Sequence, residues 1–280
     1  MDKYIDTLLA FVYSSFHTIQ LANVSVAADS NLVKSKEFNR KVEIIGDSLA
    51  AGQFTTYEGL SSFAYDFAAG LGNVEYSVTA YPGICLDDKK CYDNARGMLY
   101  QWRQVSDCSP RAVAMYGTTP ERWDPTMHRP ADLVVINIGT NDWRSPNDLP
   151  KDDYYKSYIK LIDEIHSVWP DAQIIIMSLW GYFDAAGTTY KQIPAYVGAT
   201  KRVAEHYVDQ GFVHYFDTTG ILQHNDIGPG VPHLHPTDVG HIKVASHLMQ
   251  YVKMKFGWGF AATGPEVQHD TTYWNNENGY

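Results

Sequence analysis

The sequence predicts an α/β fold in which a five-stranded parallel sheet is doubly wound between layers of helices. Apolar segments typical of strands alternate with amphipathic segments typical of helices. Residues 131–139 and 172–180 are almost continuously apolar, as expected of parallel strands that are buried on both faces. The 280 residues suffice for one large α/β domain or two small ones, and no internal repeat is evident.

In the N-terminal half of the expected fold, residues 41–46 show the hydrophobic alternation of a strand. Residues 59–71 have apolar side chains at helical spacing and end in glycines, and residues 74–81 are the second strand. The third strand is the apolar run at 131–139. The segment before it, 85–130, is irregular and long for a connection, and such loops are usually functional or disordered.

The C-terminal half continues the alternation. Residues 152–169 form an amphipathic pattern that begins with aspartates and ends before a proline, which predicts a helix. The fourth strand is expected at 172–180 and a helix at 194–211, where a glycine ends it. The fifth strand is expected at 212–218 and a final helix at 237–256.

Three regions of the chain differ in character. Residues 1–40 contain either a weak signal-like stretch or the last strand of a β-sandwich. Residues 41–258 carry the alternating strands and helices, and residues 259–280 form a polar tail. We therefore expect one catalytic or binding domain between two less regular ends.

Composition excludes two classes of partner. The formal net charge is −10, which argues against binding to a nucleic-acid backbone, since that binding relies on patches of Lys and Arg. No apolar run approaches the ~20 residues that a transmembrane helix needs.

The three cysteines are Cys85, Cys91 and Cys108. Their spacing fits no zinc motif. A bridge between Cys85 and Cys91 would close a short loop, and three free thiols are the alternative.

Polar and small residues follow successive strands of the predicted sheet. Ser48 follows the first strand, Gly83 the second and Asn141 the third, whereas His235 precedes the last helix. Ligands of an open parallel sheet bind at the carboxyl ends of its strands, so these residues should converge there. Taken singly, Ser48 could cap a helix, Gly83 could form a turn and His235 could be structural.

Together these residues meet the chemical needs of ester hydrolysis. A serine hydroxyl such as that of Ser48 becomes a good nucleophile when a base such as His235 accepts its proton. The tetrahedral intermediate carries an oxyanion, which backbone N–H groups of Ser48 and Gly83 and the amide of Asn141 can stabilise. We interpret Asp47 and Asp142, which flank these motifs, as supports of loop geometry.

These motifs resemble those of the SGNH (GDSL-type) hydrolases. The matching segments are Gly46-Asp47-Ser48, Gly83, Gly139-Thr140-Asn141-Asp142 and His235. The segments VEIIGDSLAAG, YPGICL, WDPTMHRPADLVVINIGTNDW and HPTDVGH look most like carbohydrate esterase family 2. The resemblance spans about residues 41–258 and implies the flavodoxin-like three-layer fold of the superfamily.

The resemblance also implies roles and a substrate class. Ser48 would be the nucleophile, His235 the general base, and Ser48, Gly83 and Asn141 the oxyanion hole. His235 is preferred because the family's catalytic histidine typically precedes a proline, as Pro236 does here. The partner would be an acetylated polysaccharide or oligosaccharide such as acetylated xylan or mannan. No cofactor is implied, and a polysaccharide substrate implies export from the cell.

The chain departs from the family pattern at the catalytic acid. The acid usually lies two or three residues before the histidine, where this sequence has His233 and Pro232. Asp226 and Asp238 are candidates to replace it, and a backbone carbonyl that orients His235 in a Ser–His dyad is the alternative. A second departure is that only about 40 residues precede the first motif, whereas the family carries an N-terminal β-sandwich.

Two tryptophans lie where they could contact a substrate. Trp143 and Trp180 lie at strand ends, where they either stack on a sugar ring or pack in the core, and Tyr81 is expected to pack.

A sugar-binding protein without catalysis is one alternative function. A metal-dependent hydrolase that uses His233, His235 and His241 is the other, although the expected site holds no metal.

Overall fold

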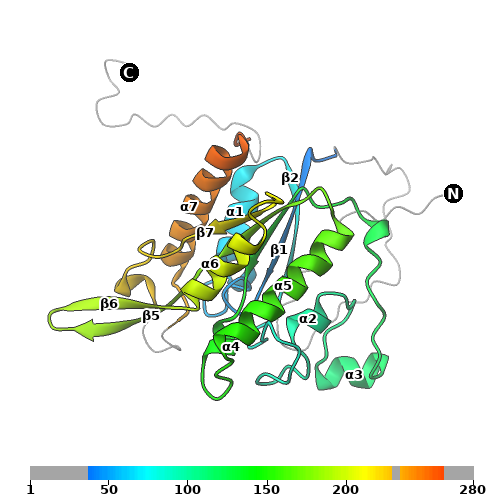
Figure 1. The fold of residues 1–280 in the computed structure, drawn as a ribbon, viewed down its shortest axis with the longest axis horizontal. Coiled ribbons are helices and arrows are strands. Elements are labelled where there is room, and N and C mark those ends of the chain that lie inside the picture. Colours follow the sequence, from blue (N-terminus) through cyan, green and yellow to red (C-terminus); the bar gives the residue numbers. More distant parts are fainter. Residues whose placement is uncertain (1–36, 229–233, 262–280) are drawn as a thin grey trace, which may run out of the picture.

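The predicted five-stranded parallel sheet is confirmed in a computed structural model, which describes residues 37–228 and 234–261 (Figure 1). The strand order is β2-β1-β3-β4-β7, and each neighbouring pair is parallel. The chain moves from β1 to β2 in one direction across the sheet and then from β3 to β7 in the other. The connection from β1 to β2 therefore crosses one face of the sheet, and the later connections cross the opposite face. The strands are β1 (Arg40–Gly46), β2 (Val74–Ala80), β3 (Leu133–Asn137), β4 (Gln173–Met177) and β7 (Val213–Phe216).

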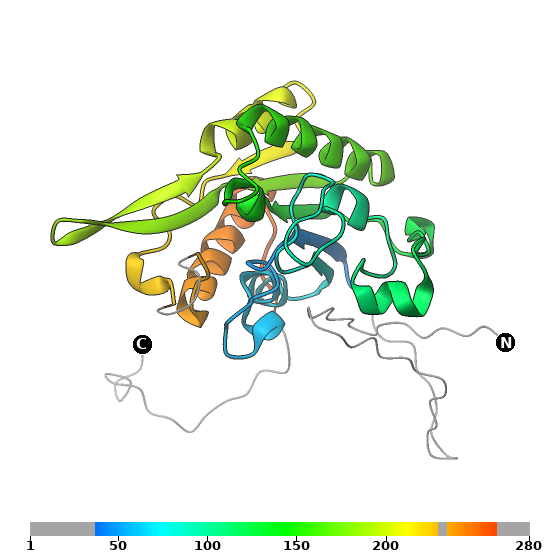
Figure 2. The same ribbon diagram turned by 90° about the horizontal axis from the view of Figure 1, so that it is seen from below.

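Two pairs of helices cover the two faces of the sheet. Helices α1 and α7 pack on one face, and α5 and α6 pack on the other (Figures 1 and 2). Each helix presents an apolar stripe to the sheet, so the core forms two layers separated by the strands. The helices are α1 (Phe63–Leu71), α5 (Lys151–Val168), α6 (Val197–His206) and α7 (Asp238–Phe256).

The helix expected at 59–71 is split into a short 3-10 helix and α1. Ser62 separates the two, and its hydroxyl accepts a hydrogen bond from the backbone N–H of Tyr65, which makes Ser62 the N-cap of α1. The remaining short elements are η1 (Glu58–Ser61), α2 (Met98–Gln101), α3 (Pro110–Tyr116), η2 (Pro125–Met127), α4 (Thr140–Trp143) and η3 (His224–Asp226).

An antiparallel hairpin that the sequence pattern did not predict follows β4. It consists of β5 (Leu179–Ala186) and β6 (Thr189–Ala195), and Gly187 with a φ of 65° lies in its two-residue loop. The expected fourth strand therefore ends at Met177, and the helix expected from 194 begins at Val197. In both ribbon views the hairpin projects away from the body of the protein (Figures 1 and 2).

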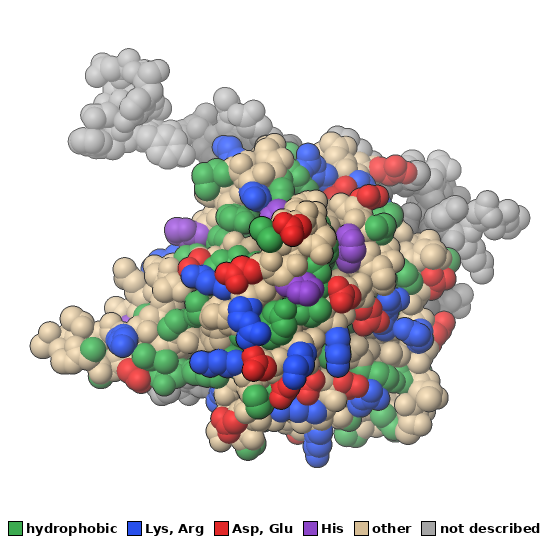
Figure 3. Space-filling model, in the orientation of Figure 1, with side chains coloured by type: hydrophobic (Ala, Val, Ile, Leu, Met, Phe, Trp, Pro, Cys, Tyr) green, Lys and Arg blue, Asp and Glu red, His purple; other side chains and the backbone are tan. Residues whose placement is uncertain are grey.

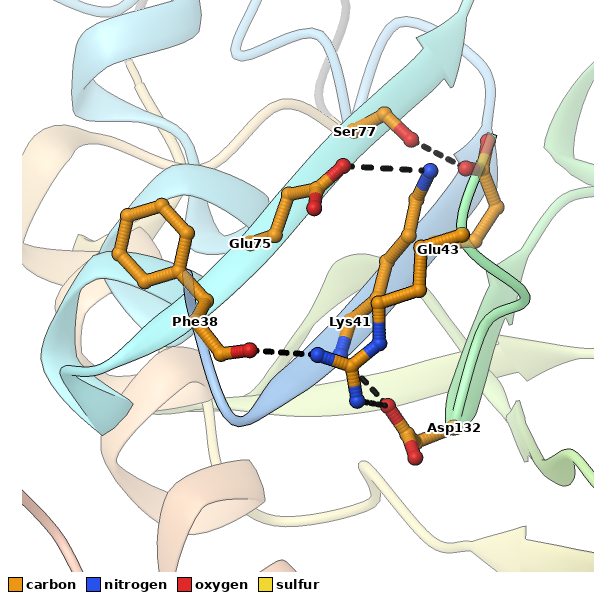
Figure 4. Close-up of polar contacts among 7 residues, drawn as sticks. Phe38, Lys41, Glu43, Glu75, Ser77 and Asp132 are labelled. Carbon is orange, nitrogen blue, oxygen red and sulfur yellow. Dashed lines mark hydrogen bonds and ion pairs between the residues drawn. The ribbon is translucent and has the colours of Figure 1, made fainter. Parts of the chain in front are cut away.

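The sheet face between β1 and β2 carries charged side chains (Figure 4). Glu43 is buried and accepts hydrogen bonds from the hydroxyls of Ser77 and Thr79, while Lys41 forms an ion pair with Glu75 at 3.3 Å. Burial raises the pKa of Glu43, and the two hydroxyl bonds oppose that rise. This part of the sheet is stabilised by a polar network in place of apolar packing.

An arginine fastens the chain where it enters β1. The guanidinium of Arg129 donates to the backbone carbonyls of Phe38 and Asn39 and lies 3.2 Å from the carboxylate of Asp132. The same carboxylate accepts the backbone N–H of Lys41 at 2.7 Å (Figure 4). The entry to β1 is therefore tied to the residues just before β3.

One face of the molecule carries a mixture of acidic and basic side chains. Lys and Arg are interspersed with Asp and Glu on the face that Figure 3 shows, without a broad patch of basic residues there. Within the described residues, no helix combines the length and apolarity needed to cross a membrane. The proposed end regions 1–40 and 259–280 lie almost wholly outside the described residues, so the division into three regions stays a prediction.

Candidate active site

Ser48 and His235 lie together at the carboxyl end of the sheet. The Nε2 atom of His235 is 2.9 Å from the hydroxyl oxygen of Ser48, although 187 residues separate them in the sequence. Each residue is only 5% exposed. This is the distance at which an imidazole can accept the proton of a serine hydroxyl.

The loop after β1 fixes the position of Ser48. A Cβ atom on Gly46, the last residue of β1, would lie 2.5 Å from the Cβ of Ala50, so this close approach requires glycine. The carboxylate of Asp47 accepts the backbone N–H of Leu49 at 3.0 Å, and the carbonyl of Ser48 accepts the N–H of Gln53 at 3.0 Å. Ser48 does not cap α1, because Ser62 does.

A separate set of bonds fixes the segment that carries His235. Pro236 pairs with Ile227 in an isolated antiparallel bridge, and the carbonyl of His235 accepts the N–H of Gly228 at 3.1 Å. The indole N–H of Trp180 donates to the carbonyl of Leu234 at 2.9 Å. The imidazole is therefore placed by the start of the hairpin as well as by its own loop.

The two aspartates considered as supporting acids have other partners. Each carboxylate oxygen of Asp226 accepts a hydrogen bond from Lys243 Nζ at 2.8 Å, and Oδ2 also accepts the N–H of Gln223. Asp238 Oδ1 accepts the N–H of Thr56 at 2.9 Å. The family's usual acid positions, Pro232 and His233, lie outside the described residues.

Asn141 lies beside the loop after β2, as expected of neighbouring strand ends. Its Nδ2 donates to the carbonyl of Ile84 at 2.9 Å. An amide nitrogen carries two hydrogens, so the second remains able to donate to a ligand. Gly83 precedes Ile84 and has a φ of 78°, a backbone conformation that disfavours other residues.

Buried carboxylates hold these loops together. Asp142 accepts the N–H groups of Leu86 at 2.7 Å and Asp87 at 3.1 Å, which fixes the β2 loop against α4. Burial raises the pKa of Asp142 to about 6. Burial, with a smaller contribution from the charge of Asp142, raises the pKa of Asp47 to about 7. The hydrogen bonds that Asp47 and Asp142 accept from backbone N–H groups agree with the interpretation of these two residues as loop supports.

A disulfide closes the loop next to Gly83. Cys85 and Cys91 are bonded, whereas Cys108 is a free thiol. The side-chain amide of Asn147 lies 3.1 Å from the sulfur of Cys91 and donates to the carbonyl of Asn141 at 2.9 Å. The bridge alternative therefore holds in this structure, and it braces the loop that Asn141 contacts.

The two tryptophans have different surroundings. Trp180, in β5, is fully buried in the core, where its ring forms a T-shaped pair with Phe63 of α1, so its proposed stacking on a sugar is wrong. Trp143 is partly buried and stacks on Tyr182 of the hairpin, with ring centroids 5.6 Å apart. Tyr81 packs against the core as expected.

Phe54 is a neighbour of the Ser–His pair that the sequence did not reveal. Its ring and the imidazole of His235 form a T-shaped pair, with centroids 4.8 Å apart and ring planes 85° apart. One phenylalanine in a loop of small and polar residues gives no pattern that periodicity or spacing can detect.

His241 has a structural environment. Its Nδ1 accepts the backbone N–H of Phe63 at 2.9 Å, which joins α7 to the start of α1, and burial lowers the pKa of His241 to about 3. Among residues 37–228 and 234–261, no group of three or more His, Cys, Asp and Glu side chains is arranged to hold a metal ion. His233, which the metal alternative also needs, is outside those ranges.

Comparisons with known proteins agree with this architecture. The family model described as "GDSL-like Lipase/Acylhydrolase family" matches residues 44–242. The cellulase/esterase CelE of Acetivibrio thermocellus is 27% identical over 259 residues, which cover 88% of this chain. This chain spans only 29% of the length of CelE.

Solved structures share the fold. An active-site mutant of a family two carbohydrate esterase from Clostridium thermocellum matches with a TM-score of 0.62 and 24% identity, over 81% of this chain and 67% of that one. A second structure of such an esterase from that organism, in complex with cellohexaose, matches with a TM-score of 0.58 and 23% identity, over the same shares. The acetyl xylan esterase Est2A from Butyrivibrio proteoclasticus matches with a TM-score of 0.59 and 18% identity, over 82% and 68%.

Proposed function

The chain belongs to the GDSL-like lipase/acylhydrolase family, and we propose that it is a carboxylic ester hydrolase that removes acetyl groups from carbohydrate with Ser48 as nucleophile. His235 is the general base in this proposal. The observation that carries the proposal is the 2.9 Å contact between His235 Nε2 and Ser48 Oγ at the carboxyl end of the sheet.

The first half of the proposed reaction transfers the acetyl group to the enzyme. Ser48 Oγ attacks the ester carbonyl carbon while its proton moves to His235 Nε2. The tetrahedral intermediate then collapses, the bond to the sugar oxygen breaks, and His235 gives its proton to that oxygen. The products are the free sugar hydroxyl and an acetyl ester on Ser48.

The second half returns the enzyme to its starting state. A water molecule gives a proton to His235 and attacks the acetyl carbonyl, after which acetate leaves and Ser48 regains its proton. In both halves the oxyanion is stabilised by the N–H groups of Ser48 and Gly83 and by the second amide hydrogen of Asn141. The loop contacts of Asp142 keep these donors in place before the substrate arrives.

The substrate class is proposed from the relatives and from the rim of the site. The matching structures include family two carbohydrate esterases, one of them in complex with cellohexaose, and an acetyl xylan esterase. Trp143 lies two residues beyond Asn141 and stacks on Tyr182. This pair offers a flat aromatic surface on which a sugar ring can stack. Acetylated xylan or mannan is the substrate we propose, and such polymers place the enzyme outside the cell.

A nucleophile variant tests the proposed chemistry. Ser48→Ala should lower kcat for p-nitrophenyl acetate by roughly 10⁴-fold or more, because no covalent intermediate can form. Ser167→Ala, at an exposed position of α5, is the matched control and should leave the rate unchanged. A serine-directed phosphonate should label the unaltered protein but not Ser48→Ala. Equal rates for the two serine variants would refute Ser48 as nucleophile.

Natural substrates then define the substrate class. Acetate release is measured from acetylated xylan, acetylated mannan and acetate esters of simple alcohols, and butyrate release from the matching butyrate esters. Faster release from a polysaccharide than from the simple acetate supports a carbohydrate esterase. Binding of deacetylated oligosaccharide without any Ser48-dependent hydrolysis would instead indicate a sugar-binding protein.

A further inference from the structure

Phe54 occupies an unusual backbone position beside the Ser48–His235 pair. The N–H of Thr55 donates to the carbonyl of Gly52 at 3.1 Å, which closes a turn with Phe54 at its third position. The φ of Phe54 is 74°. Turns with a positive φ at that position favour glycine or asparagine, because the Cβ atom of other residues is crowded.

Burial does not explain why a phenylalanine is found there. The left-handed conformation costs about 1–2 kcal/mol for a residue with a Cβ atom. Phe54 remains 50% exposed, so its ring gains only part of the free energy that a core phenylalanine would gain. Strained backbone of this kind concentrates at functional sites, where the surrounding structure maintains it.

The surrounding loop holds Phe54 against His235. The hydroxyl of Thr55 donates to the carbonyls of Gly52 at 2.7 Å and Glu58 at 3.0 Å. The N–H of Thr56 donates to Asp238, which begins α7 three residues after His235. The loop and the histidine segment are thus joined, which keeps the rings of Phe54 and His235 in a T-shaped pair with centroids 4.8 Å apart.

The path of the proton shows which part of a substrate this ring borders. His235 Nε2 delivers its proton to the oxygen of the leaving alcohol, so that oxygen must come within hydrogen-bond distance of Nε2. The acyl carbonyl oxygen points instead toward Gly83 and Asn141. A ring packed on the imidazole with half its surface exposed therefore borders the alcohol and not the acyl group.

We propose that Phe54 is a specificity-determining residue whose exposed face contacts the sugar ring that carries the ester. The inference rests on the proposed function and deepens it, because it assigns one side of the site to the leaving alcohol. Pyranose rings present C–H groups that pack on aromatic faces, whereas a small alcohol such as ethanol is too short to cover this ring. Phe54 should therefore favour sugar esters over esters of small alcohols.

The test compares two acetate esters that differ only in the alcohol. Phe54→Gly removes the ring and suits a φ of 74°, so the variant should unfold at the same temperature as the unaltered protein or higher. It should lower kcat/KM for an acetylated xylo-oligosaccharide about 3- to 10-fold, mainly through KM, and change ethyl acetate less than about 2-fold. Phe54→Leu should give an intermediate loss. Tyr57→Ala, 73% exposed on the same loop, is the control and should change neither ester.

The other outcomes separate the alternatives. An equal loss with both acetate esters would mean that Phe54 only positions His235, and an altered preference between ethyl acetate and ethyl butyrate would place Phe54 on the acyl side. Unchanged kcat/KM for the sugar ester also overturns the proposal. If the unaltered protein hydrolyses no ester, the proposed function fails. Calorimetric binding of xylotetraose then decides the sugar contact separately: weaker binding to Phe54→Gly supports it, and equal binding overturns it.

Discussion

The loops that hold the Ser–His pair differ from the aromatic side chains around it. Ser48 and Asn141 are buried, and their loops are fastened by buried carboxylates and a disulfide. Phe54, beside His235, lies half exposed on a turn, and the stacked pair of Trp143 and Tyr182 is only partly buried. Substitutions in the buried floor should therefore slow every ester, whereas substitutions on the aromatic rim should change only which ester is preferred.

The largest effect after that of Ser48→Ala is expected from Asn141→Ala in the buried floor. The substitution removes one oxyanion donor and the bond to Ile84, so kcat should fall about 10²- to 10³-fold for ethyl acetate and sugar acetate alike. Asn225→Ala, at an exposed position of η3, is the matched control and should retain full activity. A loss confined to the sugar ester would show that Asn141 affects ester preference, as a rim residue does, and would contradict the difference between floor and rim.

The disulfide tests how firmly the floor is fastened. Replacing Cys85 and Cys91 together by Ser should lower the free energy of unfolding by about 2 kcal/mol, the value expected for a loop this short. It should also lower kcat, because Cys85 follows the residue that Asn141 contacts. Urea unfolding and ethyl acetate kinetics measure the two effects, with Cys108→Ser as the control. Coincident unfolding curves for the double variant and the unaltered protein would contradict this role.

An effect on stability that is small near pH 7 and grows as the pH falls is expected at His241, beneath the floor. Its pKa of about 3 in the folded protein lies below the ~6.5 of an unfolded histidine. Below pH 6.5 the unfolded chain binds a proton that the folded protein does not, so stability falls as the pH drops toward 3. The limiting slope is about 1.4 kcal/mol per pH unit, and His241 contributes no pH dependence well above pH 6.5.

The variant His241→Asn isolates this contribution. Asparagine keeps an acceptor for the N–H of Phe63 but does not titrate. The stability difference between the two proteins, measured by urea unfolding at pH 7, 6, 5 and 4, should shift in favour of the variant as the pH falls. Asp47 and Asp142 have raised pKa values and act in the opposite direction, but they are present in both proteins and cancel in the difference. A constant difference from pH 7 to pH 4 would refute the assignment.

The parallel sheet and the floor of the site could be predicted because their signals are local. The apolar runs that became β3 and β4 are too long and too uniform to be exposed, and parallel strands bring their carboxyl ends to one edge. The structure accordingly brings Ser48 to His235, and Asn141 to the loop that follows Gly83. Their catalytic roles remain a proposal.

The hairpin and Phe54 were missed for a different physical reason. The segment that became β5 and β6 begins in an apolar run, so it read as the end of one strand and the start of a helix. Its outer half is exposed and pairs around a two-residue turn at Gly187, so no alternation of buried and exposed side chains marks it. Phe54 is placed by its backbone conformation and by the Thr56–Asp238 bond, and neither leaves a trace in residue spacing.

The anchor that Arg129 forms at the entry to β1 has a mechanical consequence. A force applied at residue 38 reaches β1 from the end of the strand opposite Ser48. Because β1 lies between β2 and β3, that force loads two ladders of backbone hydrogen bonds in shear, so that many must break together. A surface or carrier attached there should hold the protein under tension while the face that bears Ser48 remains open to a polymer.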